Sequence, residues 1–260
     1  MMDSKKYYES FNWDAAKLSE KLNVKIQKIF STIPEDVGSI LDVGCGDGVI
    51  SKALSEKYKV VAVDRSINSL KFVETVKAQS SADFLPVRSD SFDMVFSSEM
   101  IEHLPDIIFY NALDEFRRIS RKYIMLTFPN NENIEKNLVE CPECGSRFNK
   151  SYHLRSINLD RIRKLFGDYE LIDHFITGSR IRGYDKFLSL LKHRFSPPAA
   201  WIPKHWTPDG RRHTMCPKCS HEFDIPHRFS PMAFACDTLN MLVSPKKPYQ
   251  ICVLFEKKNV

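Results

Sequence analysis

Three glycines at alternate positions follow a short apolar run near the start of the chain. The segment reads Ile40-Leu41-Asp42-Val43-Gly44-Cys45-Gly46-Asp47-Gly48-Val49-Ile50. This pattern predicts a buried strand, a tight turn and then a helix. Glycine is needed where the backbone takes unusual dihedrals or touches a ligand closely, because it has no Cβ atom. The spacing differs from the G-x-G-x-x-G turn that cradles a pyrophosphate, so it favours a ligand without phosphate at the turn.

A second apolar run, Lys59 to Val63, ends in Asp64. A carboxylate at the end of that predicted strand can accept two hydrogen bonds from a ribose diol. The glycine turn and Asp64 together resemble the cofactor site of class I S-adenosylmethionine-dependent methyltransferases. The resemblance implies that S-adenosylmethionine is the cofactor, with its amino acid end and ribose against the turn.

A third segment, Phe84 to Asp106, resembles the region of that family's third and fourth motifs. In the family, residues just before the Leu85-Pro86 pair flank the adenine. Residues after the next strand, here Ser97 to Glu99, face the cofactor. The resemblance thus implies a cofactor-binding set that consists of Asp42, Gly44, Cys45, Gly46, Asp64, Arg65, Ala82, Asp83, Phe84 and Ser97.

Strand and helix patterns alternate along the chain, which predicts parallel strands joined by right-handed crossovers. Helices are expected at Trp13–Phe30, Val49–Lys57, Asn68–Lys77, Asp106–Ile119, Leu159–Phe166 and Pro231–Leu242. Strands are expected to end at Asp42 and Asp64 and to cover Asp93–Ser97, Lys122–Phe128, Glu170–Ile176 and Tyr249–Phe255. The family resemblance implies an α/β fold with a Rossmann-like, seven-stranded, mostly parallel sheet, and makes the last strand its antiparallel edge.

Two cysteine pairs lie in the region that follows the strand Lys122–Phe128. They are Cys141-Pro142-Glu143-Cys144 and Cys216-Pro217-Lys218-Cys219. Thiolates separated by two residues bind one ion in a tight turn, and two such turns complete a tetrahedral site. The pairs therefore predict a structural zinc ion that clips two distant insertions together. A dithiol redox pair and disulfides are the alternatives.

The residues around the cysteines refine this expectation. Gly145 suits the left-handed position after the first turn, whereas Ser220 indicates a strained or wider second turn. His213, His221 and His227 lie near the second pair and could each replace a cysteine. The expected organisation is a cofactor-binding core at 1–130, a zinc-binding substrate cap at 131–228 interleaved with sheet elements, and a helix and strand at 229–260 that complete the core.

Two histidines are candidates for a base that takes the proton of the methyl acceptor. His103 follows the strand Asp93–Ser97 at the carboxyl edge of the sheet, where it acts as a base or supports the cofactor site. The phrase Cys144-Gly145-x-x-Phe148-Asn149-x-x-x-His153-Leu154-Arg155 resembles a subgroup of bacterial and archaeal methyltransferases linked to cell-surface polysaccharide and similar glycan or lipid pathways. This resemblance implies that His153 faces the substrate, the alternative being a structural role beside the zinc. Arg155 is expected to hold an anionic group of the substrate or to be solvated.

Aromatic residues in two other places have open roles. Tyr7, Tyr8 and Phe11 either close over the cofactor or pack as part of the core. The segment from Arg180 to Arg212 mixes basic and aromatic residues with prolines. It can form a lid over the substrate, lie on a membrane surface or contact RNA, and the resemblance favours the lid.

Composition limits the classes of partner. The net charge of +5 is too small to require nucleic acid by itself. The first residues lack a signal-peptide core and no apolar run is long enough to span a membrane, so a cytoplasmic location with at most peripheral membrane contact is expected. The leading hypothesis is methyl transfer to oxygen or nitrogen of a small-molecule, glycan or lipid-linked acceptor. An RNA methyltransferase and a non-catalytic binding protein are the alternatives.

Overall fold

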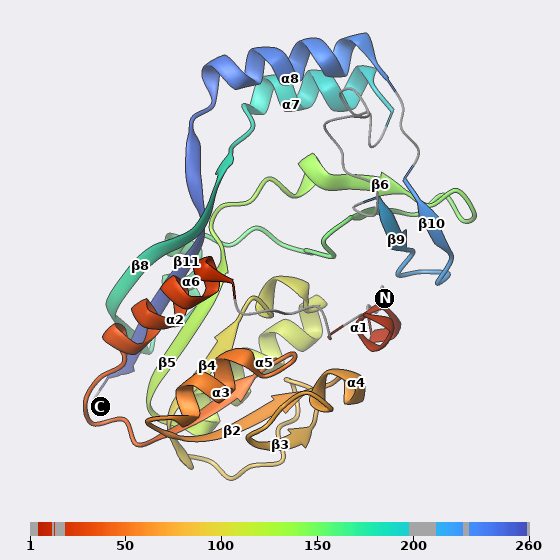
Figure 1. Ribbon diagram of the computed structural model, residues 1–260. Coiled ribbons are helices and arrows are strands. Elements are labelled where there is room, and N and C mark those ends of the chain that lie inside the picture. The colour runs from red at the N-terminus through yellow and green to blue at the C-terminus, as the bar shows by residue number, and fades with distance from the viewer. Residues whose placement is uncertain (1–4, 12, 14–18, 198–211, 226–228, 259–260) are drawn as a thin grey trace.

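A computed structural model of the chain describes residues 5–11, 13, 19–197, 212–225 and 229–258. Its centre is a seven-stranded sheet in the order β3-β2-β1-β4-β5-β11-β8 (Figure 1). The strands of the sheet are β1 (Ser39–Val43), β2 (Lys59–Asp64), β3 (Val76–Gln79), β4 (Phe92–Ser98), β5 (Ser120–Pro129), β8 (Tyr169–Arg182) and β11 (Lys246–Lys257). The first five strands of that order pair in parallel, and β11 runs antiparallel to both of its neighbours. The predicted α/β fold with a mostly parallel sheet is confirmed.

Helices cover both faces of the sheet because successive residues of each strand point to opposite sides. The helices are α1 (Lys5–Ser10), α2 (Glu20–Thr32), α3 (Val49–Ser55), α4 (Ile67–Leu70), α5 (Asp106–Ile119), α6 (Leu159–Leu165), α7 (Lys186–Phe195) and α8 (Pro231–Val243), with short 3-10 turns at Ile101–His103 and Ile134–Asn137. On one face α5 and α6 bury Leu41, Val95 and Ile124. On the other face α2 and α3 bury Ile40, Met94 and Met125. In the part of the chain that the structure describes, no helix is long and apolar enough to cross a membrane.

Three expected elements differ from the structure. The helix expected at Trp13–Phe30 begins at Glu20, with Ser19 as its N-cap, and residues 14–18 lie outside the described part. The helix expected at Asn68–Lys77 ends after Leu70, and Val76–Gln79 forms β3 against β2. The β-branched pair Thr75 and Val76 favours a strand, and this preference outweighs the helical spacing of the preceding residues.

The last strand, β11, is also not at the edge of the sheet as expected, because β8 pairs with its outer side. Residues 251–255 of β11 are buried and apolar, whereas most of β8 is exposed and carries polar residues such as Asp173 and His174. The more apolar strand therefore takes the interior position, where both of its faces are covered, and the more polar strand takes the edge.

Two segments leave the core and form a cap. The first follows β5 and contains β6 (Leu138–Glu140) paired with β7 (Arg147–Asn149). The second follows β8 and contains α7 and the pair β9 (His213–Met215) and β10 (Glu222–Asp224). In Figure 1, α7 and α8 lie side by side beyond the far ends of β8 and β11. Of the segment 180–212, the structure shows the end of β8 and α7, while residues 198–211 lie outside the described part.

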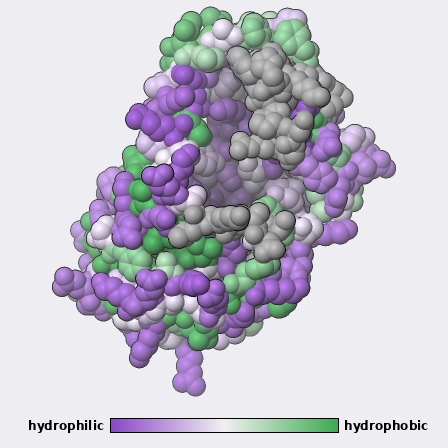
Figure 2. Space-filling model, in the orientation of Figure 1, coloured by the Kyte–Doolittle hydropathy of each residue, from purple (hydrophilic) through white to green (hydrophobic). Residues whose placement is uncertain are grey.

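Apolar side chains are exposed on α7 and α8. Phe187 is 66% exposed, Leu190 67% and Leu242 81%. Figure 2 shows hydrophobic residues gathered over these two helices at the top of the molecule.

The glycine turn generates a prediction about stability. Gly44 has a φ of +75°, and a Cβ atom there would lie 2.4 Å from Cγ of Met100. We expect Gly44→Ala to lower the free energy of unfolding by about 2–4 kcal/mol, because backbone strain and a steric clash add. Gly183→Ala is the matched control, since nothing lies within 4 Å of its Cβ position. Its effect should stay within about 1 kcal/mol in urea unfolding. Equal effects of the two substitutions would contradict this account of the turn.

Candidate functional site

A cavity opens at the carboxyl ends of β1, β2 and β4, where the glycine turn meets the loops after the neighbouring strands. Its wall consists of Tyr8, Trp13, Val43, Gly44, Cys45, Gly46, Asp64, Arg65, Ser80, Ser81, Ala82, Ser98, Glu99, Met100, His103, Leu104 and Ile108. Parallel strands bring their carboxyl ends to one edge of a sheet, which is where ligands bind in open α/β folds. The cavity is therefore the candidate site for a cofactor.

Hydrogen bonds join the glycine turn to the end of β2. The amide nitrogen of Gly46 donates to Oδ2 of Asp64 at 2.9 Å, and that of Ser66 donates to Oδ1 at 2.8 Å. Gly44 also donates its N–H to the carbonyl of Val63. Burial raises the pKa of Asp64. Each carboxylate oxygen thus has one backbone donor and keeps lone-pair capacity for a ligand hydroxyl.

The structure brings together six of the residues expected to bind the cofactor. They are Gly44, Cys45, Gly46, Asp64, Arg65 and Ala82. Of the N-terminal aromatic residues that were expected either to close over the cofactor or to pack in the core, Tyr8 lines the cavity. Trp13 also lines it, and its indole N–H donates to the carbonyl of Tyr8.

Four other expected cofactor residues do not line this cavity. Asp42 is buried and accepts a hydrogen bond from Ser51, and Ser97 is buried and donates to the carbonyl of Val43. Both side chains point to the faces of the sheet, because they lie inside strands rather than after them. Phe84 is 78% exposed, and Asp83 accepts a hydrogen bond from Ser81. The cavity wall at this point comes from residues 80–82 instead.

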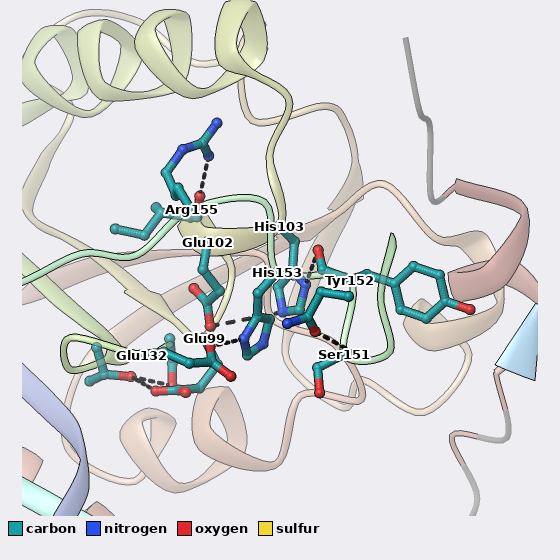
Figure 3. Close-up of polar contacts among 12 residues, drawn as sticks. Glu99, Glu102, His103, Glu132, Ser151, Tyr152, His153 and Arg155 are labelled. Atoms are coloured by element: carbon teal, nitrogen blue, oxygen red, sulfur yellow. Dashed lines mark hydrogen bonds and ion pairs between the residues drawn. The ribbon is translucent and has the colours of Figure 1, made fainter. Parts of the chain in front are cut away.

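The two candidate histidines lie beside each other, with ring centroids 4.7 Å apart (Figure 3). His103 lines the cofactor cavity and also a second cavity, which His153, Phe148 and Tyr152 line on the cap side. The hydroxyl of Tyr8 lies 2.9 Å from Nδ1 of His103. Burial and the neighbouring His153 lower the pKa of His103 to about 3, so this ring is neutral. As expected, His103 is nearer to the cofactor cavity than His153.

Arg155 does not point into either cavity. Its guanidinium donates to the carbonyl of Ile101 and to Asp106, and lies 4.0 Å from the centre of the Phe109 ring. The expectation that Arg155 holds an anionic substrate group is wrong in this structure. The first turn of α5 lies beside Arg155, and the carboxylate of Asp106 and the ring of Phe109 in that turn bind its guanidinium.

Three glutamates surround the histidines. Glu99 was expected to face the cofactor and lines that cavity, whereas Glu102 and Glu132 were not named as site residues from the sequence. Glu132 contacts Nδ1 of His153, and Oε1 of Glu99 accepts hydrogen bonds from Lys25 and Thr127. Glu102 is 1% exposed, and burial with Glu99 nearby raises its pKa well above the usual value. The available signal was the group of three titratable residues within Glu99-Met100-Ile101-Glu102-His103, directly after a strand.

The four paired cysteines form one group in the cap. The sulfur atoms of Cys141 and Cys219 are 3.6 Å apart, as are those of Cys144 and Cys216, and all four lie within 4.8 Å of one another. The two turns have the same conformation: Gly145 has a φ of 66° and Ser220 a φ of 60°. Ser220 therefore occupies the same left-handed position as Gly145, and the second turn is not wider than the first.

Four thiols at these distances have the composition and closure of a structural zinc site. His213 points to Asp224 instead, and His221 stacks on Phe223. His227 lies outside the described residues. No histidine is needed to complete a four-thiolate shell.

Residues 41–123 match the family model described as a methyltransferase domain. A ubiquinone biosynthesis O-methyltransferase from Xylella fastidiosa is 30% identical over 94 residues, which cover 32% of this chain and 38% of that protein. The chain thus aligns with well under half of that relative's length. The region that matches the family model, 41–123, contains the glycine turn, Asp64 and His103.

Solved structures share the fold across most of the chain. A methyltransferase dependent on S-adenosylmethionine from Archaeoglobus fulgidus has a TM-score of 0.55 at 13% identity, and covers 91% of this chain and 93% of its own. The cyclase SpnF also has a TM-score of 0.55, at 15% identity, with 97% and 87% covered. Since a cyclase has this fold too, the reaction must be argued from the site.

Asp42 generates a prediction about pH. Burial, reinforced by the charge of Asp64 and opposed by the Ser51 hydrogen bond, raises the pKa of Asp42 to about 7. Between about pH 4 and 7 the folded protein then holds a proton that the unfolded chain releases. This group should therefore make the free energy of unfolding fall as pH rises, by at most about 1.4 kcal/mol per pH unit.

The comparison with Asp42→Asn isolates that contribution, because an amide can still accept the hydrogen bond of Ser51. We expect the stability of the variant relative to the natural protein to increase from pH 4 to 7 and to level off above pH 7, in urea unfolding of the cofactor-free protein. Parallel stability curves for the two proteins would show that Asp42 titrates normally.

Proposed function

We propose that the protein is an S-adenosylmethionine-dependent methyltransferase. The observation that supports this most is the turn Gly44-Cys45-Gly46, hydrogen-bonded to Asp64 at the wall of an open cavity. The cavity fits the proposed cofactor in three respects. The turn presents backbone that lacks Cβ atoms at its glycines, and Asp64 retains acceptor capacity for ribose hydroxyls. Residues 80–82 and Ile108 form a wall of polar and apolar groups against which the adenine would lie.

The bound cofactor would supply a methyl group on a sulfonium; the acceptor atom would bond to this methyl group and lose its proton, and S-adenosylhomocysteine would leave as the neutral thioether. The residues of this chain would position both partners and keep water away. Tyr8 and Trp13 would close the cavity on one side, and Leu104 and Ile108 would supply apolar wall on another.

The acceptor would enter through the second cavity, lined by His103, Phe148, Tyr152, His153 and Pro217 among others. Because His103 belongs to both cavities, it marks the point where acceptor and cofactor would meet. The size of this cavity suits a small molecule or the end of a glycan or lipid-linked acceptor. The similarity to the Xylella protein, an O-methyltransferase, supports oxygen as the acceptor atom. His153 and His103 are the proposed polar residues that face the acceptor.

We also propose that Cys141, Cys144, Cys216 and Cys219 bind a structural zinc ion. Their sulfur atoms come from the two segments that leave the core, so one ion would hold both halves of the cap. Tyr152, between these halves, donates its hydroxyl to the carbonyl of Met215 and packs on Tyr7 at a ring distance of 4.1 Å. The zinc would thereby support the wall of the acceptor cavity from behind.

Cofactor binding tests the central proposal. Isothermal titration with S-adenosylhomocysteine should give a dissociation constant in the micromolar range, and NAD should not bind. Asp64→Asn should weaken binding by about 1–3 kcal/mol, because charged hydrogen bonds to the ribose are lost. Asp83→Asn is the control, since Asp83 does not line the cavity. Binding of NAD, or a folded sample with no affinity for S-adenosylhomocysteine, would refute the proposal.

Metal content tests the zinc proposal. The purified protein should contain about one zinc ion per chain by elemental analysis, with sulfur neighbours near 2.3 Å in X-ray absorption. Cys141→Ser should lower the zinc content sharply and make the cap sensitive to proteolysis, while the sheet stays folded by circular dichroism. Cys236→Ala should keep its zinc, because Cys236 lies in α8 away from the cluster. Retention of zinc in the Cys141→Ser protein would contradict the assignment.

A further inference from the structure

Glu102 is a buried carboxylate without a partner. It is 1% exposed, and neither of its oxygens has a hydrogen-bond partner among the residues that the structure describes. Such a group is costly to bury, and in native proteins it is paired or coordinates a metal. The short turn Ile101–His103 places this buried side chain beside the two histidines (Figure 3).

Both neighbouring histidines have the same nitrogen occupied. Nδ1 of His153 contacts the carboxylate of Glu132, and Nδ1 of His103 lies 3.3 Å from the carbonyl oxygen of Tyr152. Carboxylate and carbonyl oxygens can only accept, and the Tyr8 hydroxyl, 2.9 Å from Nδ1 of His103, can accept as well as donate. A proton on Nδ1 therefore suits all of these partners and leaves a lone pair on Nε2. Histidines that bind metals are held in this way, with the second nitrogen donating to a carboxylate or a backbone carbonyl.

Possible ligand atoms of the three side chains lie close together. One oxygen of Glu102 and one nitrogen each of His103 and His153 lie within 4.8 Å of one another, and Nε2 of His103 is 3.8 Å from Oε1 of Glu102. Ligands that share an ion with bonds of about 2.0–2.2 Å lie about 3–4 Å apart, so small side-chain movements suffice. Figure 3 shows the side chains of Glu102, His103 and His153 next to one another, with Glu102 linked to His103 and Glu132 linked to His153.

The surrounding charge is negative. Glu99, Glu102 and Glu132 lie together, and Lys25 is the basic side chain bound to Glu99. In the ionised form that binds a metal, Glu102 would join two further carboxylates against one ammonium group, and a divalent cation would balance this negative charge. The charge and the ligand atoms therefore favour the same occupant.

We propose that Glu102, His103 and His153 bind a divalent cation of the first transition row or Mg²⁺, with Glu132 as the residue that positions His153. Two imidazoles and one carboxylate leave coordination positions open for exogenous oxygen ligands. The site lies where His103 separates the two cavities.

The role of the ion rests on the proposed methyl transfer. An ion at this place would hold an acceptor through its oxygen atoms, which narrows the acceptor to a hydroxyl compound and disfavours an amine. An acceptor with two adjacent oxygens, such as a vicinal diol or a catechol, would fill two open positions at once. His103 and His153 would then serve as ligands rather than as bases.

Mn²⁺ is the probe for the experiment. The zinc-loaded protein, freed of other divalent ions, is titrated with Mn²⁺, and free Mn²⁺ is followed by electron paramagnetic resonance. We expect one ion per chain to bind in the micromolar range. Glu102→Gln and His153→Ala each remove a proposed ligand and should weaken Mn²⁺ binding more than 100-fold. Glu132→Gln changes only the residue that positions His153 and should weaken binding by about 10–100-fold. His174→Ala, on the exposed strand β8, is the matched control and should bind as the natural protein does.

Thermal unfolding provides a second readout that does not depend on activity. Mn²⁺ should raise the melting temperature of the natural protein and not that of Glu102→Gln. Without metal, Glu102→Gln should be about as stable as the natural protein, because the amide replaces a carboxyl group that has no hydrogen-bond partner to lose. A variant that binds Mn²⁺ normally, or one whose loss of stability is the same with and without Mn²⁺, would overturn the proposal.

Titration with S-adenosylhomocysteine separates this proposal from the preceding one. Glu102 does not line the cofactor cavity, so Glu102→Gln should bind S-adenosylhomocysteine with nearly the same dissociation constant as the natural protein. Product binding without Mn²⁺ binding would refute the metal site alone. Mn²⁺ binding without product binding would refute the proposed cofactor and leave the metal site in place.

Discussion

Parallel pairing of β1, β2 and β4 is the constraint on which the candidate site depends. Each strand can pair only as far as its end, so the turns after Val43, Asp64 and Ser98 all meet at one edge of the sheet. The hydrogen bond from Gly46 to Asp64 then fixes the first two turns to each other. The third turn begins at Glu99, whose φ of 54° reverses the chain and directs Glu102 and His103 beneath the cap. Residues that are distant in sequence thus face one cavity without any long loop.

The features that sequence could predict are those determined by local chemistry. The glycine turn and Asp64 follow from backbone conformation and strand ends, and the cysteine pairs from ligand spacing. The outer strands and Arg155 could not be predicted in the same way, because their positions depend on which element lies beside them. β11 takes an interior position because β8 is more polar, and Arg155 turns away because the start of α5 offers Asp106 and Phe109. The segment Glu99-Met100-Ile101-Glu102-His103 shows that titratable residues follow a strand, but it does not show which of them is buried, so the burial of Glu102 could not be predicted.

The cap and the N-terminal segment depend on each other through Tyr152. This residue has a φ of 58° and lies among Tyr7, Phe148 and the backbone of Met215. Its carbonyl reaches His103, while the hydroxyl of Tyr8 reaches the same ring nitrogen. A displacement of either segment would therefore change the surroundings of His103. These contacts thus connect the N-terminal segment and the cap to the ring of His103, which lines both cavities.

The long strands β8 and β11 separate the helical pair from the rest of the molecule. The chain leaves the sheet along β8 and returns along β11, and these strands are paired from Tyr169 with Lys257 to Arg182 with Lys246. The strand by which the chain leaves the sheet and the strand by which it returns are thus neighbours up to the end of their pairing. An insertion held in this way can be lengthened, shortened or replaced in evolution without a change in the register of the inner strands. Proteins with this core can therefore diversify in α7 and α8, whose apolar surface is exposed, at little cost to the fold.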